Sequence, residues 1–113
     1  MRKFIAGIAL AATACLSSPV NAAESMLTSW YGSYFHGRTT ANGETYNMYG
    51  YTAASPYLPF NTKLLVCYDG CVAVRINDRG PYVGGRQLDL SYGAAEQIGL
   101  LLPGVAYTAV TYI

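Results

Sequence analysis

Short apolar runs separated by turn-forming residues make up most of this chain, and helical periodicity is almost absent. Leu64–Val66 and Val72–Val74 are typical runs, and Asp69-Gly70 between them predicts a β-hairpin. Apolar runs of this length favour strands when turn residues bound them. We expect strands at Leu27–Tyr31, around Tyr51–Ala54, at Lys63–Tyr68, at Cys71–Asn77, near Gln87–Leu90 and at Val105–Ile113.

One segment has the spacing of a helix. Ser91 is a good N-cap, Ala94 and Ile98 belong to an apolar face, and Gly99 suits the C-terminal stop. A mainly β fold of about six short strands with one short α-helix near 91–99 predicts a closed barrel, because closure leaves no strand edge exposed. A β-sandwich is the alternative, but a helix before the last strand of so small a domain fits a barrel better.

The N-terminal residues predict export. Met1-Arg2-Lys3 is positively charged, Phe4–Leu16 is largely apolar, and Val20-Asn21-Ala22 has the short side chains that a signal peptidase reads. We therefore expect residues 1–22 to be a signal peptide and residues 23–113 to form one domain, which is periplasmic or secreted. The apolar run is shorter than the ~20 residues of a membrane span. The alternatives are a buried N-terminal helix and a lipid anchor at Cys15, whose preceding residues loosely resemble a lipoprotein cleavage box.

Charge and cysteine content narrow the class of partner. Removal of residues 1–22 takes away two of seven basic residues, which leaves 7 − 2 = 5 against six acidic residues. A domain so close to neutral lacks the positive surface that binds nucleic acid or an anionic membrane, so a glycan, a peptide or another protein fits better. We expect Cys67 and Cys71 to form a disulfide in an exported protein. Half of a zinc site is the alternative, but only His36 is available as a further ligand. We expect no metal, no cofactor and a monomer.

Residues that carry chemistry gather near the ends of two predicted strands. Asn77-Asp78-Arg79-Gly80-Pro81 follows an apolar run, and Leu88-Asp89-Leu90-Ser91 comes soon after it. A strand that leads polar groups into a loop often presents an active site. The eleven tyrosines and one tryptophan offer flat apolar faces that suit sugar rings, although tyrosine also favours strands in general. Among them we expect Trp30 and Tyr31 to line a groove.

Seven segments of the chain occur together in a characteristic order. They are Ser29–Gly32, Phe35–Arg38, Thr40–Glu44, Tyr51–Ala54, Leu58–Phe60, Arg75–Pro81 and Leu88–Ser91. In this order they resemble the RlpA-like (rare lipoprotein A) double-psi β-barrel domain over nearly the whole chain after the leader, and more loosely the plant expansins. The resemblance implies a six-stranded double-psi β-barrel in the bacterial envelope. It also implies action on peptidoglycan glycan strands as an endolytic lytic transglycosylase that leaves 1,6-anhydro-muramyl ends.

The resemblance further implies a catalytic pair, an Asp in the Asn-Asp-Arg-Gly-Pro motif and a His after Thr-Ala-Ala. Asp78 matches the Asp and is the candidate acid/base, since lytic cleavage needs a group that donates a proton and then accepts one. Ser55 stands where the His is expected and is the second candidate catalytic residue, as a hydrogen-bond donor. The replacement favours a second hypothesis, a non-catalytic glycan-binding module that loosens the wall as expansins are thought to do. A small secreted inhibitor that uses the barrel as a scaffold is a third hypothesis.

Several candidate site residues could either contact the substrate or only hold the fold together. We expect substrate contacts from Trp30, Tyr31, His36, Asn77, Arg79 and Asp89. Asp78 could instead bind backbone amides in a turn or pair with Arg79, and Asp89 could cap the helix that follows it. His36 could be a loop histidine that bonds to the backbone, and Glu44 could be a second carboxylate on the groove rim.

Overall fold

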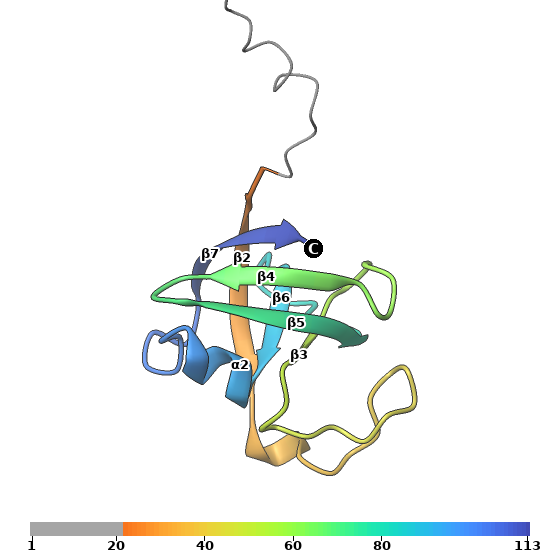
Figure 1. The fold of residues 1–113 in the computed structure, drawn as a ribbon. Helices are drawn as coiled ribbons and strands as arrows, with labels where there is room; N and C mark the ends of the chain where they lie inside the picture. The colour runs from red at the N-terminus through yellow and green to blue at the C-terminus, as the bar shows by residue number, and fades with distance from the viewer. Residues whose placement is uncertain (1–21) are drawn as a thin grey trace, which may run out of the picture.

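The computed structural model describes residues 22–113, which form a six-stranded barrel with one α-helix (Figure 1). The strands are β2 (Glu24–Tyr31), β3 (Thr52–Ala54), β4 (Lys63–Cys67), β5 (Cys71–Asp78), β6 (Leu88–Ser91) and β7 (Ala106–Tyr112). A turn of 3-10 helix, η2 (Ser33–Phe35), follows β2, and α2 (Tyr92–Gln97) lies between β6 and β7. The predicted strands and helix are confirmed. Apart from Ala22, the predicted signal peptide, with Cys15, lies outside the described residues.

The strands close into a barrel in the order β2-β6-β3-β5-β4-β7. Two neighbouring pairs, β2–β6 and β3–β5, are parallel, and the other four neighbouring pairs are antiparallel. This mixed closed sheet confirms the predicted double-psi β-barrel and excludes the sandwich. Because β3 lies between β5 and β6, it brings together two segments that the sequence analysis treats separately.

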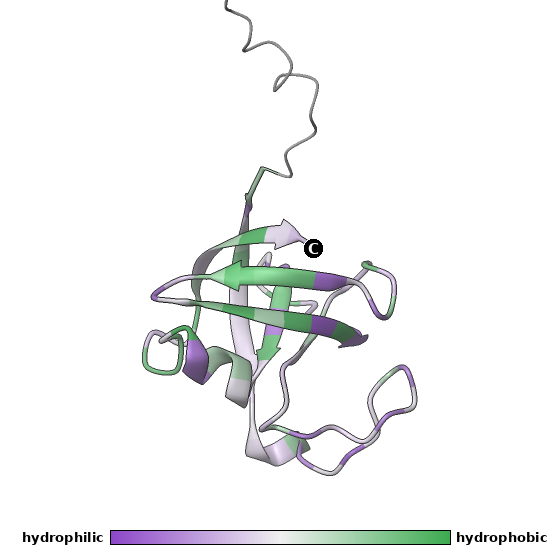
Figure 2. Cartoon of the chain, in the orientation of Figure 1, coloured by the Kyte–Doolittle hydropathy of each residue, from purple (hydrophilic) through white to green (hydrophobic). Residues whose placement is uncertain are grey.

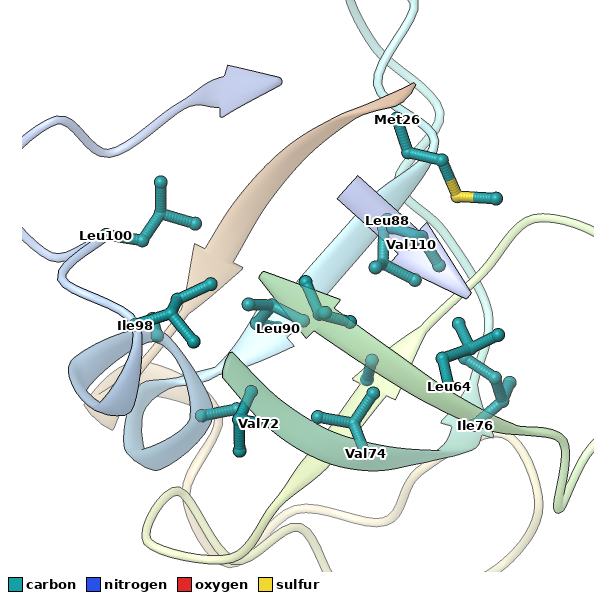
Figure 3. Close-up of a cluster of buried hydrophobic side chains, with 14 residues drawn as sticks. Met26, Leu64, Val72, Val74, Ile76, Leu88, Leu90, Ile98, Leu100 and Val110 are labelled. Atoms are coloured by element: carbon teal, nitrogen blue, oxygen red, sulfur yellow. The ribbon is translucent and has the colours of Figure 1, made fainter. Parts of the chain in front are cut away.

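Apolar residues recur along the strands (Figure 2), and side chains from every strand fill the barrel (Figure 3). The fully enclosed members include Leu64, Val66, Ile76, Leu88, Leu90 and Val110. Helix α2 packs against β2, β5 and β6 and adds Ala94 and Ala95 to the same cluster, followed by Ile98 and Leu100. The α2 N-cap is Ser91, as predicted, and its hydroxyl accepts a hydrogen bond from the Ala94 amide. With its interior filled by side chains, the barrel leaves only its outer face and its loops for binding.

The long segment between η2 and β3 is fastened to the barrel. The Tyr46 hydroxyl donates to the Tyr31 carbonyl at 2.7 Å, and the Gly93 amide donates to the Met48 carbonyl at 2.7 Å. Gly93 has to be glycine, since a Cβ there would lie 2.7 Å from the Tyr49 carbonyl oxygen. These contacts fasten the segment to the end of β2 and to the first turn of α2.

The β4–β5 hairpin carries the predicted disulfide. Cys67 and Cys71 face each other in the register of the pair, and their sulfur atoms are bonded. The prediction of this bond is confirmed. Across residues 22–113, no helix combines the length and apolarity that a membrane crossing needs.

Candidate functional site

A β-bulge at the end of β5 sets the direction of Asp78. Ala53 pairs with Ile76 and the next residue, Ala54, pairs with Asp78, so that Asn77 has no partner on β3. Ile76 and Asn77 are both buried, which interrupts the alternation of the strand. Bulges of this kind often re-aim a side chain next to an active site. Here the bulge turns Asp78 away from the core and onto the outer face.

Asp78 and Asp89 stand on either side of Ala54. In the parallel pair β3–β5, Ala54 is opposite Asp78, and in the antiparallel pair β3–β6 it is opposite Asp89. Side chains of directly paired residues emerge on the same face of a sheet, and two strand spacings place the aspartate Cα atoms roughly 10 Å apart. Ala54 contributes only a methyl group on this face, so little side-chain volume separates the two carboxyl groups.

A pocket of about 220 Å³ opens above Ala54. Its lining combines the two aspartates with aromatic and turn residues: Tyr31, Phe35, Ala54, Asp78, Arg79, Gly80, Pro81, Tyr82 and Asp89. Phe35 comes from η2 and the highly exposed Tyr82 from the loop after β5. Aromatic walls around convergent carboxyl groups suit a sugar ring, whose faces are apolar and whose edges are polar.

Hydrogen bonds anchor one oxygen of Asp78. Its Oδ1 accepts from the amides of Ala41 and Arg79, each at 2.9 Å, while Oδ2 accepts from the Tyr31 hydroxyl at 3.3 Å. Asp78 therefore does bind backbone amides, as the structural interpretation held, but with one oxygen. Its second oxygen meets a tyrosine in the pocket, and the side chain is partly exposed.

Asp89 lines the same pocket. Its Oδ1 accepts a hydrogen bond from the Ser29 hydroxyl at 2.9 Å, and Ser29 is its partner in the β2–β6 register. Burial raises the pKa of Asp89 to about 6, and the negative charge of Asp78 adds to this, while Ser29 and Arg86 act in the opposite direction. Asp89 is not a helix cap, because Ser91 has that role. It is a carboxyl group that changes charge near neutral pH.

The two arginines of the motif do not form ion pairs with Asp78. Arg75 binds Glu44 through its Nη1 and Nη2 atoms, at 2.8 and 2.9 Å, and this is the one ion pair within 4.0 Å among residues 22–113. Arg79 lies over the ring of Phe60 at 4.0 Å and donates to the carbonyls of Ser55 and Asp78. Neither guanidinium neutralises the carboxylate of Asp78 by direct contact.

Glu44 supports the site from outside the pocket. Hydrogen bonds from Arg75, and then from Asn77, lower the pKa of Glu44 to about 2. The Asn77 amide group donates to Glu44 at 3.1 Å, and the Asn77 carbonyl oxygen accepts from the Asn42 amide at 3.3 Å. This network holds the loop whose Ala41 amide binds Asp78. Asn77 is 2% exposed, so it positions the loop and is not part of the pocket lining.

Trp30 and Tyr31 point to opposite faces of β2, as neighbours on a strand do. Tyr31 lines the pocket and stacks on Tyr46 at 4.4 Å. Trp30 packs against the core, edge-on to Tyr92, and its indole nitrogen donates to the Leu101 carbonyl at 3.3 Å. Of the pair, only Tyr31 reaches the pocket.

Ser55 and His36 lie outside the pocket lining. Ser55 is 0% exposed, and its hydroxyl accepts from the amides of Tyr57 and Leu58 at 3.3 and 2.9 Å. His36 is exposed, and its Nδ1 accepts from the Met48 amide at 3.1 Å. Both geometries are those of residues that hold a loop.

The structure also brings in residues that the sequence analysis did not single out. Ala54, Phe35 and Tyr82 line the pocket, and Ser29 binds Asp89. Phe35 and Ala54 occur in the segments that carry the family resemblance, whereas Tyr82 could have been noticed as an aromatic residue directly after Gly80-Pro81. Within residues 22–113, no cluster of three or more His, Cys, Asp or Glu side chains could hold a metal ion.

A second hollow, of about 310 Å³, lies on the outer face of β4 and β5. Tyr51, Lys63 and Arg75 are among its lining residues, and none of those residues is acidic. Proton transfer to or from a substrate needs a group that titrates near neutral pH. The smaller pocket, with its two aspartates, is therefore the better candidate for chemistry.

Comparison with known proteins identifies the family of this chain. Residues 23–112 match the model of a family described as lytic transglycolase. The endolytic peptidoglycan transglycosylase RlpA of Campylobacter jejuni is 52% identical over 83 residues, 71% of this chain and 30% of that protein. The RlpA of Vibrio cholerae is 43% identical over 101 residues, 87% of this chain and 38% of that protein. The chain belongs to the RlpA-like lytic transglycolase family, which confirms the resemblance found in the sequence.

Two further findings show how far the comparisons extend, one on chain length and one on fold. The matched region spans about a third of the length of these two curated relatives. Among solved structures, the Streptomyces papain inhibitor superposes with a TM-score of 0.66 over 84% of this chain and 97% of that one. Its sequence is 19% identical, so the likeness concerns the barrel fold alone.

Proposed function

We propose that this chain is an endolytic peptidoglycan lytic transglycosylase that cleaves cell-wall glycan strands in the pocket above Ala54. The observation that carries the proposal is the placement of Asp78 and Asp89 on the two sides of Ala54, in a pocket with aromatic walls. The curated relatives with this name support the same activity.

The reaction fits this pocket. Lytic cleavage breaks the glycosidic bond at C1 of the muramyl sugar and joins C1 to the C6 hydroxyl of the same sugar. It therefore needs proton transfer at two oxygens and no activated water, in contrast to hydrolysis. Asp78 is the carboxylate that we place at the reacting sugar, because its Oδ2 is directed to Tyr31 in the pocket while its Oδ1 is anchored by backbone amides.

Tyr31 and Arg79 complete the proposed site. Burial and the charge of Asp78 raise the pKa of Tyr31, so its hydroxyl stays protonated and donates to Asp78. The guanidinium of Arg79 lies at the pocket wall over Phe60. We propose that it donates hydrogen bonds to the glycan, since it has donors beyond those used for the two carbonyls.

Export is part of the proposal. Peptidoglycan lies outside the cytoplasm, so a protein that acts on it has to cross the inner membrane. We propose that residues 1–22 are removed as a signal peptide and that residues 23–113 act in the periplasm or after secretion. The Cys67–Cys71 disulfide is consistent with an oxidising compartment.

A non-catalytic glycan-binding function is the second candidate. It is favoured by Ser55, which stands at the position of the expected histidine and whose hydroxyl is committed to backbone amides. The pocket would then bind a sugar ring without cleaving it.

Incubation of the purified protein with glycan strands stripped of stem peptides separates the two functions. We expect soluble fragments to be released by the wild type, and Asp78→Asn to reduce their release at least a hundredfold while the protein still sediments with the insoluble glycan. Asp69→Asn, a matched change at the exposed hairpin tip, is the control and should retain full release. Binding without release by the wild type would contradict the enzymatic function.

A further inference from the structure

We propose that Asp78 and Asp89 divide the proton transfers: Asp89 gives its proton to the leaving oxygen, and Asp78 takes the proton of the attacking C6 hydroxyl. This inference rests on the proposed lytic activity. It assigns to Asp89 the acid half of a role that the sequence analysis gave wholly to Asp78.

The register of the sheet gives the pair its spacing. Asp78 and Asp89 are each opposite Ala54, so their Cα atoms are roughly 10 Å apart across one intervening strand. Both side chains line the pocket. A sugar ring above Ala54 would therefore have one carboxyl group on each side, which allows one group to serve the leaving oxygen and the other to serve the attacking hydroxyl.

The two aspartates have opposite surroundings. All three groups in contact with Asp78 are donors, namely the Ala41 and Arg79 amides and the Tyr31 hydroxyl, and they suit a carboxylate that accepts. Asp89 accepts one hydrogen bond, from Ser29, and burial raises its pKa. A buried carboxyl group with few donors keeps its proton to higher pH, which suits an acid.

The charges that face Asp89 come from several elements. The negative charge of Asp78 on β5 favours the protonated form of Asp89, and Arg86, before β6, opposes it. Tyr31 on β2 and Tyr46 in the long loop are also close, and burial raises the pKa values of both. These tyrosines therefore stay neutral, and Asp78 is the anionic neighbour.

The proposed step balances in atoms and charge. The Asp89 proton moves to the glycosidic oxygen, and the bond between that oxygen and C1 breaks. The C6 oxygen forms a new bond to C1, and its proton moves to the carboxylate of Asp78. The step leaves Asp89 ionised and Asp78 protonated. Exchange of one proton with solvent at each group restores the initial state, and no water enters the product.

A substrate with a good leaving group tests whether Asp78 and Asp89 divide the two proton transfers. An aryl glycoside of the muramyl sugar releases a phenolate, which leaves without protonation, whereas native glycan requires an acid. With the full chain, we expect Asp89→Asn to lose at least a hundredfold in rate on native glycan and less than about fivefold on the aryl glycoside. Asp78→Asn should lose at least a hundredfold on both substrates. Asp69→Asn, at the exposed hairpin tip, is the matched control and should keep the wild-type rate on both substrates.

The possible outcomes distinguish a failure of the division of proton transfers from a failure of the proposed lytic activity. Equal losses by Asp89→Asn on the two substrates, or full activity on native glycan, would overturn the division while the lytic activity stands. An inactive wild type would contradict the proposed function itself. A readout independent of activity is the carboxyl carbon resonance of Asp89, which should titrate with a midpoint at about 6. In Asp78→Asn this midpoint should move to lower pH, and an unchanged midpoint would show that the two groups are not coupled.

Discussion

Asp78 and Asp89 are eleven positions apart in the chain and are both opposite Ala54 in the barrel. The relationship arises because β3 pairs with β5 in parallel and with β6 antiparallel, and because the bulge at Asn77 advances β5 by one residue. A sheet without the bulge would place Asn77 opposite Ala54. The candidate site thus depends on strand register as much as on the identity of its residues.

The position of Ala54, between the two carboxyl groups, should tolerate no larger side chain. Ala54→Leu would fill the space above the strand, since Ala54 lines the pocket and is not part of the core cluster. We expect at least a tenfold loss of kcat/KM for glycan cleavage, measured well below the unfolding transition, because the 3% exposed Ala54 is also a position where a larger side chain lowers the thermal unfolding midpoint. Ala109→Leu, on an exposed position of β7, is the matched control. Full activity of Ala54→Leu would show that the substrate does not pass between Asp78 and Asp89.

The stability of the protein should fall as pH rises through the titration of Asp89. The pKa of this group is 3.8 as a free side chain and about 6 in the fold. At pH values between these two, Asp89 is protonated in the folded state and ionised in the unfolded state. Unfolding free energy therefore decreases over this range, by about 3 kcal/mol. Glu44, whose pKa is lowered to about 2, contributes in the opposite direction at lower pH.

Asp89→Asn removes this titration and should flatten the curve. Urea unfolding at pH 4, 5, 6 and 7 should show similar stability for the variant and the wild type at pH 4 and a more stable variant at pH 7. Such a gain with loss of activity is common where an active site holds a destabilised group. Parallel curves for the two proteins would mean that Asp89 is not the titrating group.

Ser55 should matter for the stability of its loop. In Ser55→Ala the amides of Tyr57 and Leu58 lose their acceptor, which should cost about 1 to 3 kcal/mol of unfolding free energy in urea titrations. We expect the rate of glycan cleavage, measured well below the unfolding transition, to change less than about threefold, as for the exposed control Ser25→Ala. A tenfold loss without destabilisation would instead assign the Ser55 hydroxyl to the substrate.

The disulfide should stabilise the hairpin without affecting the pocket. Replacement of Cys67 and Cys71 by Ser opens a loop that is short, so the expected loss of unfolding free energy is about 2 kcal/mol. The pocket lies at the other end of β5, about 23 Å along the strand from Cys71, and the cleavage rate should therefore not change. Loss of cleavage in a folded double variant would indicate coupling along β5.

Much of the fold follows from local signals. The strands are apolar runs with turn residues between them, and Ser91 marks the start of the helix, so that propensity and pattern agree with the final structure. The disulfide followed from the hairpin at Asp69-Gly70. The position of Asp78 at the end of a strand could be predicted for the same reason.

The site itself depends on contacts between distant segments. No local pattern shows that Asn77 forms a bulge, that Arg75 turns to Glu44, or that the Ala41 amide binds Asp78. The opposite directions of Trp30 and Tyr31 could have been predicted, because neighbours on a strand face opposite sides. The Ala54 side chain has no polar or titratable group, and only the register of β3 reveals that it lies between Asp78 and Asp89.

Cleavage in water enriched in oxygen-18 tests the central claim most directly. If the pocket joins C6 to C1, the released ends are 1,6-anhydro sugars that lack one water relative to the hydrolysis product and carry no heavy oxygen, as mass spectrometry would show. Asp78→Asn should release none of them. Ends that contain oxygen-18 would identify a hydrolase, and they would contradict a lytic reaction at Asp78 and Asp89.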